Sequence, residues 1–500
     1  MEQMKKRKIN NSAAYRMITG VFKQQRGGLT TADITAKTAL PLDTVRELMP
    51  DISSEYSARV SVTESGEILY SFPSGFKSKY RGFKAAAGRV LRAIGNAVKT
   101  ASAALFKVWI MVMLLGYFVF FMLIALAALM LSVVGSNSSN SDNRQGGSGG
   151  GFFFASGIFD FIIRIWFYSE LTRSLDGAYA YGRTRKAPKG KPLYKAIFSF
   201  VFGDGDPNAA LETRERQALI SYIQANKGVI SLPEFMVLTG TSGGAADSLI
   251  GAYCAEYGGM PEATNDGTVV YRFDDLLRRV DRRDRSFGGF SAPLKRLKQF
   301  SSNLKKMNIW FGIINAINLF FGSYFFIEAM NSGHILTQEH FNAASRIYGV
   351  TYVLMSNFIS NPLPAIFIGL GVVPLVFSLL FWLIPLIRFI LLKQDNEKIK
   401  LENLRKTGFT AIWENPENVN PNDIKPASVE CQPKDMTAAR ERVIKDMGVY
   451  SIPDVVVNEN GETIYSFNEL NREKTALEKY RLKIDSRESE LGKVIFNTDE

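Results

Sequence analysis

Two long runs of uncharged, mostly apolar residues constrain this chain more than any other feature. Residues 108–134 contain no charge over 27 positions, and residues 347–387 contain none over 41. Runs of about 20 apolar residues are long enough to cross a bilayer as helices. The average composition hides these runs, since 46% hydrophobic and 22% charged residues are ordinary values. The sequence therefore excludes a wholly soluble protein.

Four segments are apolar enough to predict membrane-spanning helices, at 105–134, 152–169, 308–328 and 363–392. The second is short and carries Asp160 and Arg164, which lie four residues apart. Charges at membrane depth often mark an ion pathway. We expect this lone pair instead to neutralise itself on one helical face and let the segment insert.

The last apolar region contains features that interrupt a straight helix. Pro374 and Pro385 should kink the fourth span, because proline removes a backbone donor. The stretch 347–360 is uncharged but polar in part, and a crossing there would place the basic C-terminal flank outside. We therefore predict that it is re-entrant, interfacial or folded within the outer loop 329–362.

Lysine and arginine are distributed unevenly around the four spans. They are concentrated in 76–104, 170–205, 277–306 and 393–406, whereas 135–151 and 328–346 contain only Arg144 and Arg346. Short loops rich in Lys and Arg face the cytoplasm. Four spans place every basic flank on that side, which predicts a cytoplasmic (inner) membrane protein with both termini cytosolic. The flanks should contact anionic lipid head groups.

A short pattern of Gly, three residues, Tyr, one residue and Phe occurs three times. Each copy follows polar turn residues and an extended run, which predicts a β-hairpin whose turn needs a positive φ at the glycine. The residues are Gly66, Tyr70 and Phe72; Gly267, Tyr271 and Phe273; and Gly461, Tyr465 and Phe467.

Helical patterns precede the first two hairpins in the same order. Each has a first helix, at 13–24 or 212–225, and then a helix–turn–helix in which Thr31 or Ser231 can act as the N-cap. Helix, helix–turn–helix and hairpin is the winged-helix order. In the third copy, at roughly 424–480, we find only a helix at 438–447 and the hairpin, with the first helices degraded or absent.

A net charge of +12 raises the question of nucleic-acid binding. The helices that would enter a major groove argue against it, because 42–49 has two acids and one arginine and 241–255 has no basic residue. In the third copy, Arg440, Arg442 and Lys445 are offset by neighbouring acids. Affinity for DNA comes mainly from neutralising phosphates. Modules of this kind more often bind proteins, so the sequence favours a protein partner or self-association over nucleic acid.

No pattern typical of an enzyme or a cofactor site occurs. There is no phosphate-binding loop, nucleophile elbow or dinucleotide fingerprint. Two cysteines, Cys254 and Cys431, are too few for a disulfide framework or a four-thiolate site. His334 and His340 lack zinc spacing. We therefore expect no catalytic residue, no metal and no cofactor.

Two polar groups are better explained by structure than by ligand binding. The run 204–208 with two glutamates imitates a calcium loop, but Pro207 stiffens it and the required glycine is missing. We expect Asp206 to cap a helix that begins at Pro207. Asn315 and Asn318 in the third span should hydrogen-bond neighbouring helices.

The run Phe202-Gly203-Asp204-Gly205-Asp206-Pro207-Asn208, the helix after it and the Gly-x-x-x-Tyr-x-Phe hairpins resemble a family of uncharacterised multi-pass membrane proteins of bacteria and chloroplasts. Chloroplast members sometimes carry an iron–sulfur biogenesis label. Two distant thiols cannot hold a cluster in one monomer. We therefore do not transfer that label.

These observations predict an α-helical membrane protein with about four transmembrane helices and three small α+β winged-helix-like cytosolic modules. We expect a scaffold or adaptor that uses the modules for protein contacts. The alternatives are a membrane-tethered DNA-binding transcription regulator and a transporter or transporter subunit. The predicted order is module 1 at 10–75, a basic segment at 76–104, span 105–134, a Gly/Ser-rich outer loop at 135–151, span 152–169, a basic linker at 170–205, module 2 at 206–276, a basic segment at 277–306, span 308–328, outer loop 329–362, span 363–392, a helix and linker at 393–423, and module 3 at 424–485.

Overall fold

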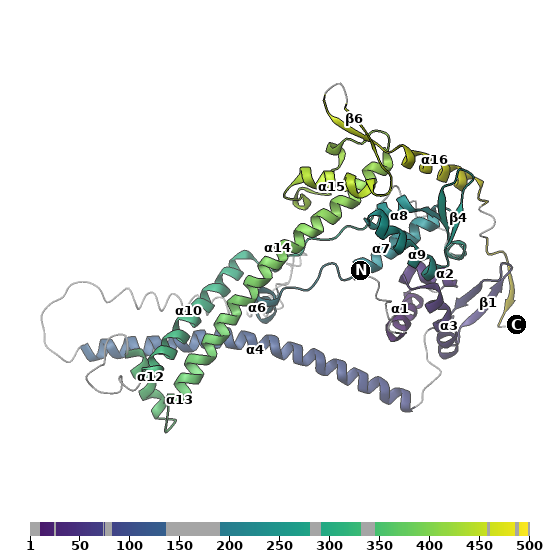
Figure 1. Cartoon of the computed structure of the whole chain (residues 1–500). Helices are drawn as coiled ribbons and strands as arrows, with labels where there is room; N and C mark the ends of the chain where they lie inside the picture. The colour runs from purple at the N-terminus through teal and green to yellow at the C-terminus, as the bar shows by residue number, and fades with distance from the viewer. Residues whose placement is uncertain are drawn as a thin grey trace, which may run out of the picture. The chain divides into compact units, whose positions relative to one another are not determined.

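The computed structural model shows a mostly helical protein with small antiparallel sheets (Figure 1). The structure describes residues 11–24, 27–73, 75, 83–136, 191–280, 292–331, 346–457, 461–485 and 490–498. The chain forms two compact units. We call residues 90–205 and 299–393 the span unit, and residues 1–89, 206–298 and 394–500 the hairpin unit.

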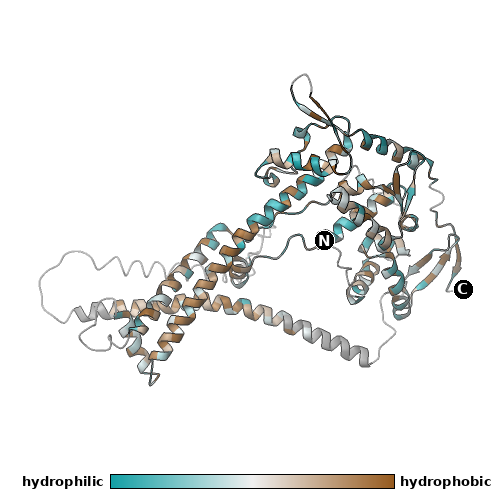
Figure 2. Ribbon diagram, viewed as in Figure 1, coloured by the Kyte–Doolittle hydropathy of each residue, from teal (hydrophilic) through white to brown (hydrophobic). Residues whose placement is uncertain are grey.

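The span unit is built from apolar helices, which are mostly brown in Figure 2. Three described helices are long and apolar enough to cross a membrane, over Thr100–Met130, Lys305–Met330 and Leu363–Glu414. They match three of the four predicted spans. The fourth, 152–169 with Asp160 and Arg164, lies outside the described residues. The elements are α4 (Phe83–Ser136), α6 (Leu193–Phe202), α10 (Lys305–Met330), α12 (Arg346–Ser356), α13 (Leu363–Ala365), η3 (Ile366–Val372) and α14 (Val373–Glu414).

The last span begins at Leu363 as predicted but continues beyond its predicted end. A π-helical stretch, η3, ends at Val372, two residues before Pro374, which has no N–H to donate to the preceding turn. Pro385 lies inside α14, and this helix continues to Glu414. The predicted span ends at 392, where the charges begin, and a separate helix is predicted within 393–423. The two form one continuous helix, because charged residues with high helix propensity extend it.

Helix α12 lies in the uncharged stretch 347–360. It has 11 residues, and at about 1.5 Å per residue its length is roughly 16 Å. The apolar core of a bilayer is about 30 Å thick. The helix by itself is therefore too short to cross the apolar core.

Small residues and amides hold the span helices together. A Cβ added at Gly322 of α10 would lie 2.9 Å from the backbone nitrogen of Leu375. Asn318 Nδ2 donates to the Leu114 carbonyl of α4 at 2.8 Å, and Asn315 Nδ2 donates to the Ser378 carbonyl of α14 at 2.9 Å. These bonds confirm that the two asparagines link neighbouring helices.

In the hairpin unit, two segments have the same element order at a constant spacing. The first module contains α1 (Asn11–Gln24), α2 (Thr31–Thr38), α3 (Leu42–Tyr56), β1 (Arg59–Thr63) and β2 (Ile68–Ser71). The second contains α7 (Leu211–Ala225), β3 (Val229–Ser231), α8 (Leu232–Thr239), α9 (Gly243–Tyr257), β4 (Met260–Ala263), β5 (Val269–Arg272) and η1 (Asp274–Leu276). Helices α8 and α9 and strands β4 and β5 each begin 201 residues after their counterparts α2, α3, β1 and β2.

The third module uses the end of α14 as its first helix. Residues Leu404, Phe409 and Trp413 of α14 lie in the same core as Val443 and Phe467. The later elements are η4 (Pro421–Asp423), η5 (Val429–Cys431), α15 (Met436–Gly448), β6 (Asp454–Val457), β7 (Thr463–Ser466), α16 (Asn468–Lys483) and β8 (Val494–Asn497). The sequence predicts a helix within 393–423, but not that this helix packs in the core of the third module.

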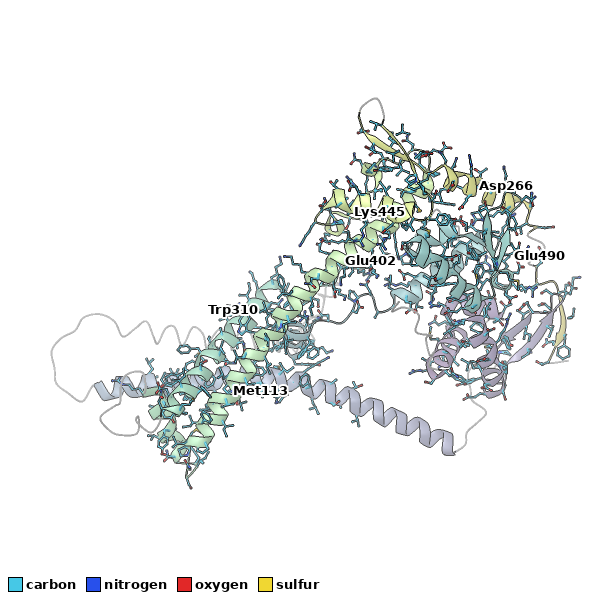
Figure 3. The ribbon with its side chains drawn as sticks, viewed as in Figure 1. Met113, Asp266, Trp310, Glu402, Lys445 and Glu490 are labelled. Carbon is cyan, nitrogen blue, oxygen red and sulfur yellow. The ribbon has the colours of Figure 1, made fainter. Side chains whose placement is uncertain are left out.

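All three predicted hairpins are present as antiparallel pairs. Gly66, Gly267 and Gly461 have φ of 79°, 80° and 77°, which confirms the positive φ expected at each turn. Asp266, which precedes Gly267 in the sequence, is labelled in Figure 3. The aromatic residues point inward to different degrees: Tyr70, Phe273 and Phe467 are buried, and Phe72, Tyr271 and Tyr465 are partly buried.

Two helix starts differ from the predictions. Thr30, not Thr31, is the N-cap of α2, whereas Ser231 caps α8 as predicted. Helix α7 begins at Leu211 and not at Pro207. The Asp206 carboxylate accepts from the Asn208 N–H at 2.9 Å, which closes a local turn before the helix instead of capping it.

Candidate functional site: contacts between the hairpin modules

Matching capping boxes begin the short helices of the first two modules. Thr30 and Asp33 form the box of α2, and Ser231 and Glu234 form that of α8. In each, the N-cap hydroxyl accepts from the backbone of the acid three residues on, and the acid accepts from the N-cap N–H. Both acids are buried, with Asp33 3% and Glu234 1% exposed. A buried carboxylate needs further donors to offset its desolvation.

Each capping acid receives that further donor from a later part of the chain. Asp33 accepts from the Val280 N–H at 3.0 Å, and Val280 follows the second hairpin. Glu234 accepts from the Arg481 guanidinium at 2.9 and 2.6 Å, and Arg481 lies on α16, which follows the third hairpin. The capping boxes therefore tie the first module to the second and the second to the third.

The Glu234–Arg481 pair lies in a small polar network inside the core. Tyr222 of α7 donates its hydroxyl to Glu234 at 2.7 Å, and Arg481 also donates to the Val229 carbonyl at 2.8 Å. Burial and the nearby Glu234 charge raise the pKa of Tyr222, so the phenol stays protonated and donates. Burial lowers the pKa of Arg481, but the Glu234 carboxylate outweighs burial, and the net effect is to raise it.

The first and second modules contact each other through side chains that reach backbone carbonyls. Gln217 donates to the Lys37 carbonyl at 2.6 Å, and Tyr257 donates to the Ala39 carbonyl at 3.2 Å. Leu42 of α3 is 2% exposed and belongs to the core of the second module. The contact is therefore both apolar and hydrogen-bonded.

The third module contacts the second through the end of α14. Lys406 is 4% exposed, and its ammonium bonds to Glu215 and, at 2.9 Å, to the Pro293 carbonyl. Its aliphatic stem crosses Gly240, where an added Cβ would lie 2.7 Å from Lys406 Cγ. Gly240 has φ of 70° at the C-cap of α8, so glycine is favoured there for two reasons.

Arg46 and Arg440, which lie on helices that would read DNA, form contacts within the hairpin unit. Arg46 of α3 forms an ion pair with Asp275 at 2.9 Å. In α15, Arg440 donates to the Ile424 carbonyl and to Asn422. Arg442 and Lys445 are exposed, beside exposed Glu441. Arg46 is thus paired, whereas Arg442 and Lys445 remain exposed on α15, where Glu441 offsets one of their two charges.

The remaining groups that were considered as metal ligands are the two histidines and the two cysteines. His334 and His340 lie outside the described residues. Among the residues that the structure describes, no group of three or more His, Cys, Asp or Glu could hold a metal ion. Cys254 and Cys431 are free thiols, and burial raises the pKa of Cys254 to about 11, which keeps it protonated and unreactive.

The run 202–208 that supports the family resemblance lies at the end of an apolar helix, α6. The sequence analysis placed this helix within a basic linker, although Ile197, Phe200 and Val201 are buried in the core of the span unit. Arg388 donates to the Phe200 and Val201 carbonyls at the end of α6, at 3.0 and 2.7 Å. A Cβ at Gly203 would lie 3.2 Å from this guanidinium. The run therefore closes a helix end.

Asp204 in the same run is held by donors from two segments. Its carboxylate accepts from Lys191 and, at 2.6 Å, from the Ser302 N–H. Burial raises the pKa of Asp204, but these hydrogen bonds outweigh burial and lower it overall. The carboxylate is thus used in structure rather than in a calcium loop.

Asp33, Glu234 and Arg481 were missed by the sequence analysis. A signal for the first two exists, since Ser or Thr followed three residues later by an acid is a capping-box pattern. Arg481 has no such signal, because its partner lies 247 residues away.

Comparison with known proteins gives one distant match. The chain is 28% identical over 294 residues to "Uncharacterized protein At5g03900, chloroplastic" of Arabidopsis thaliana. The aligned part covers 55% of this chain and 50% of that protein, so the chain spans about half the length of this relative. No family model matches, and no solved structure matches. The match agrees with the resemblance to a family that has chloroplast members.

Proposed function

We propose that this protein is a membrane-anchored scaffold or adaptor whose three winged-helix-like modules form one cytosolic body for protein contacts. The observation that carries the proposal is the core shared by the second and third modules, against which Leu42 of the first module packs. The buried Glu234–Arg481 pair fixes two of the modules to each other. A single rigid body presents a defined surface to a partner, whereas loosely tethered modules do not.

The packing also supports a cytosolic placement with four spans. Modules in one unit must lie on the same side of a membrane. Helix α4 provides one crossing between the first and second modules. The chain then has to cross the membrane a second time between them if both modules lie on the same side. The segment predicted to make this crossing is 152–169, which lies outside the described residues. Helices α10 and α14 supply the two crossings between the second and third modules. With the Lys and Arg bias, this supports a topology with both termini in the cytosol.

The shared core argues against the transcription-regulator alternative. Helices α3 and α9 contact each other within the unit, and α9 carries no Lys or Arg. Insertion of either helix into a major groove would require the modules to separate. The excess positive charge of the chain lies in segments beside the spans, where it can meet anionic lipid.

A transporter is the second candidate, because the span unit contains buried polar atoms without a hydrogen-bond partner. They are Asn315 Oδ1, Asn318 Oδ1 and Ser378 Oγ. Unpaired polar groups at membrane depth can line a path for a polar solute. The test is uptake or efflux in vesicles with Asn315→Leu and Asp160→Asn, each checked for normal insertion.

Photo-crosslinking in intact membranes tests the adaptor proposal. A photoreactive amino acid at exposed positions of the hairpin unit, followed by purification in detergent, should give one stoichiometric protein adduct. Placement of the probe in the loop 135–151 is the control and should give none. DNA retention by the full chain that falls steeply with salt, without a protein adduct, would contradict the adaptor and support the regulator.

A further inference from the structure

The three hairpins share a pairing pattern that defines the outer edge of each, because the tyrosine strand also pairs with an upstream residue on its other side. In the first, Leu29 and the hairpin tyrosine Tyr70 exchange N–H···O bonds at 3.0 and 2.9 Å. In the third, Val419 and Tyr465 exchange bonds at 2.9 and 3.0 Å. The N–H and C=O of the tyrosine therefore point away from the other strand of the hairpin. In an antiparallel pair, the residue opposite the tyrosine then points its own N–H and C=O away from the hairpin, toward the outer edge.

The outward residue is different in each hairpin. Val60 lies opposite Tyr70, Pro261 opposite Tyr271, and Val455 opposite Tyr465. Alternation makes Val457 the next outward residue of β6. These positions decide whether another strand can be added at the edge.

The first two edges are closed by different means. Strand β8 pairs with β1, and Val60 exchanges 3.1 Å bonds with Thr498, whose N–H donates to the Val60 carbonyl and whose Oγ1 accepts from the Val60 N–H. In the second hairpin, Pro261 has no N–H to offer, and proline at an edge prevents strand addition. The chain therefore shows both a bound strand and a block at equivalent positions.

The third edge has neither protection. Among the described residues, β6 pairs only with β7. Val455, Val456 and Val457 are 60%, 54% and 65% exposed, and Ile452 nearby is 83% exposed. An exposed valine strand with unpaired backbone groups is a template for another strand.

We propose that the β6 edge binds an extended strand of a partner protein, rich in β-branched residues and carrying Lys or Arg, by antiparallel strand addition. The charge of the hairpin supports this partner, since 454–466 contains three acids and no Lys or Arg. Pairing with a second copy would bring two such acidic hairpins together. The strand that closes the first hairpin, β8, follows Lys493 and has the sequence Val-Ile-Phe-Asn. The proposal rests on the adaptor function and names the kind of partner that the adaptor binds.

The test uses the full chain in nanodiscs and a dye-labelled peptide with the sequence of residues 490–498, in which Lys replaces Glu490. Val455→Pro copies Pro261 of the second hairpin and removes an outward N–H, while Val455→Thr keeps it and serves as the matched control. We expect Val455→Pro to weaken peptide binding by about tenfold, as the loss of one or two edge hydrogen bonds implies. Val455→Thr should change it by less than about threefold, and Glu462→Lys should weaken it several-fold.

Equal peptide affinity for Val455→Pro and Val455→Thr, or no binding at all, would overturn the proposal. So would a dimer of the unmodified chain that Val455→Pro converts to a monomer, because the edge would then belong to a second copy. If Val455→Pro proves unfolded by circular dichroism, Val457→Pro and Glu462→Lys decide the question. Failure of the adaptor function is seen separately, as the absence of a protein adduct in the crosslinking experiment.

Discussion

The span unit and the hairpin unit use different interactions to join helices that are distant in sequence. In the span unit, single amides donate to backbone carbonyls and glycines allow close approach, as at Asn318 and Gly322. In the hairpin unit, buried acids of capping boxes accept from later segments, as at Glu234 and Arg481.

The surroundings explain this difference. Lipid offers no water to compensate an ionised group, so neutral donors and small residues are favoured between spans. A water-exposed body can bury an ion pair when extra hydrogen bonds satisfy both charges. This difference predicts that a single substitution lowers the free energy of unfolding most at the buried ion pair and less at the amides.

The largest effect is expected at Arg481. Replacing Arg481 by Met leaves the Glu234 carboxylate buried and without its cationic partner, which should destabilise the hairpin unit by about 3–5 kcal/mol. Arg46→Met at the exposed Arg46–Asp275 pair is the control, with an expected change of about 0–1 kcal/mol. Denaturant unfolding followed by hydrogen exchange of residues 229–257 measures both. A similarly small loss of unfolding free energy in both variants would contradict the claim that the buried Glu234–Arg481 pair stabilises the unit more than an exposed pair does.

A smaller effect is expected at the crossing of α10 and α14. Gly322→Ala places a Cβ against the Leu375 backbone and should cost about 1–3 kcal/mol. Gly369→Ala meets nothing within 4 Å and should have little effect. The midpoint of thermal unfolding in detergent distinguishes the two variants. Equal midpoints would show that α10 and α14 do not approach closely at Gly322.

Loss of one amide bond in the span unit should have a smaller effect still. Asn318→Leu removes the bond to the Leu114 carbonyl and should cost about 0.6–1.7 kcal/mol. Asn331→Ala, at the exposed end of α10, is the control. A loss as large as that of Arg481→Met would contradict the difference drawn between the two units.

The smallest effect is a pH dependence at Glu473 in the hairpin unit. Burial raises the pKa of Glu473 above its ordinary value of 4.5, although the hydrogen bond from Tyr450 opposes burial. Because the pKa of Glu473 is raised in the folded state, the protonated carboxyl contributes its full stabilisation below pH 4.5. That stabilisation is lost as the pH rises through the pKa of Glu473 in the folded protein. Glu473→Gln should therefore stabilise the protein slightly at pH 7 and give no gain at pH 4. Unfolding midpoints at the two pH values measure this, and a larger gain at pH 4 would reverse the sign.

Local patterns were sufficient to predict much of this fold. Three spans follow from apolar length, and the hairpins follow from glycines such as Gly66 that need a positive φ. The sequence also predicts a helix within 393–423, but not that it is continuous with the last span or that it packs in the core of the third module.

The candidate site was less accessible from sequence. The capping acids Asp33 and Glu234 show a local pattern, but Val280 and Arg481 are placed only by tertiary packing. The open edge of β6 also depends on which residue faces outward, and this follows from the pairing of Tyr465 with Val419 rather than from the hairpin alone. The C-terminal strand, near Glu490 in Figure 3, closes the first hairpin from more than 400 residues away.

Paired topology reporters test most directly whether the three modules form one cytosolic body. Green fluorescent protein and alkaline phosphatase, each fused in turn after residue 285 and after Glu500, report the side on which the second module and the C-terminus lie. The account predicts fluorescence and no phosphatase activity at both positions. Phosphatase activity at either position would place a module across the membrane from its partners and contradict the shared core.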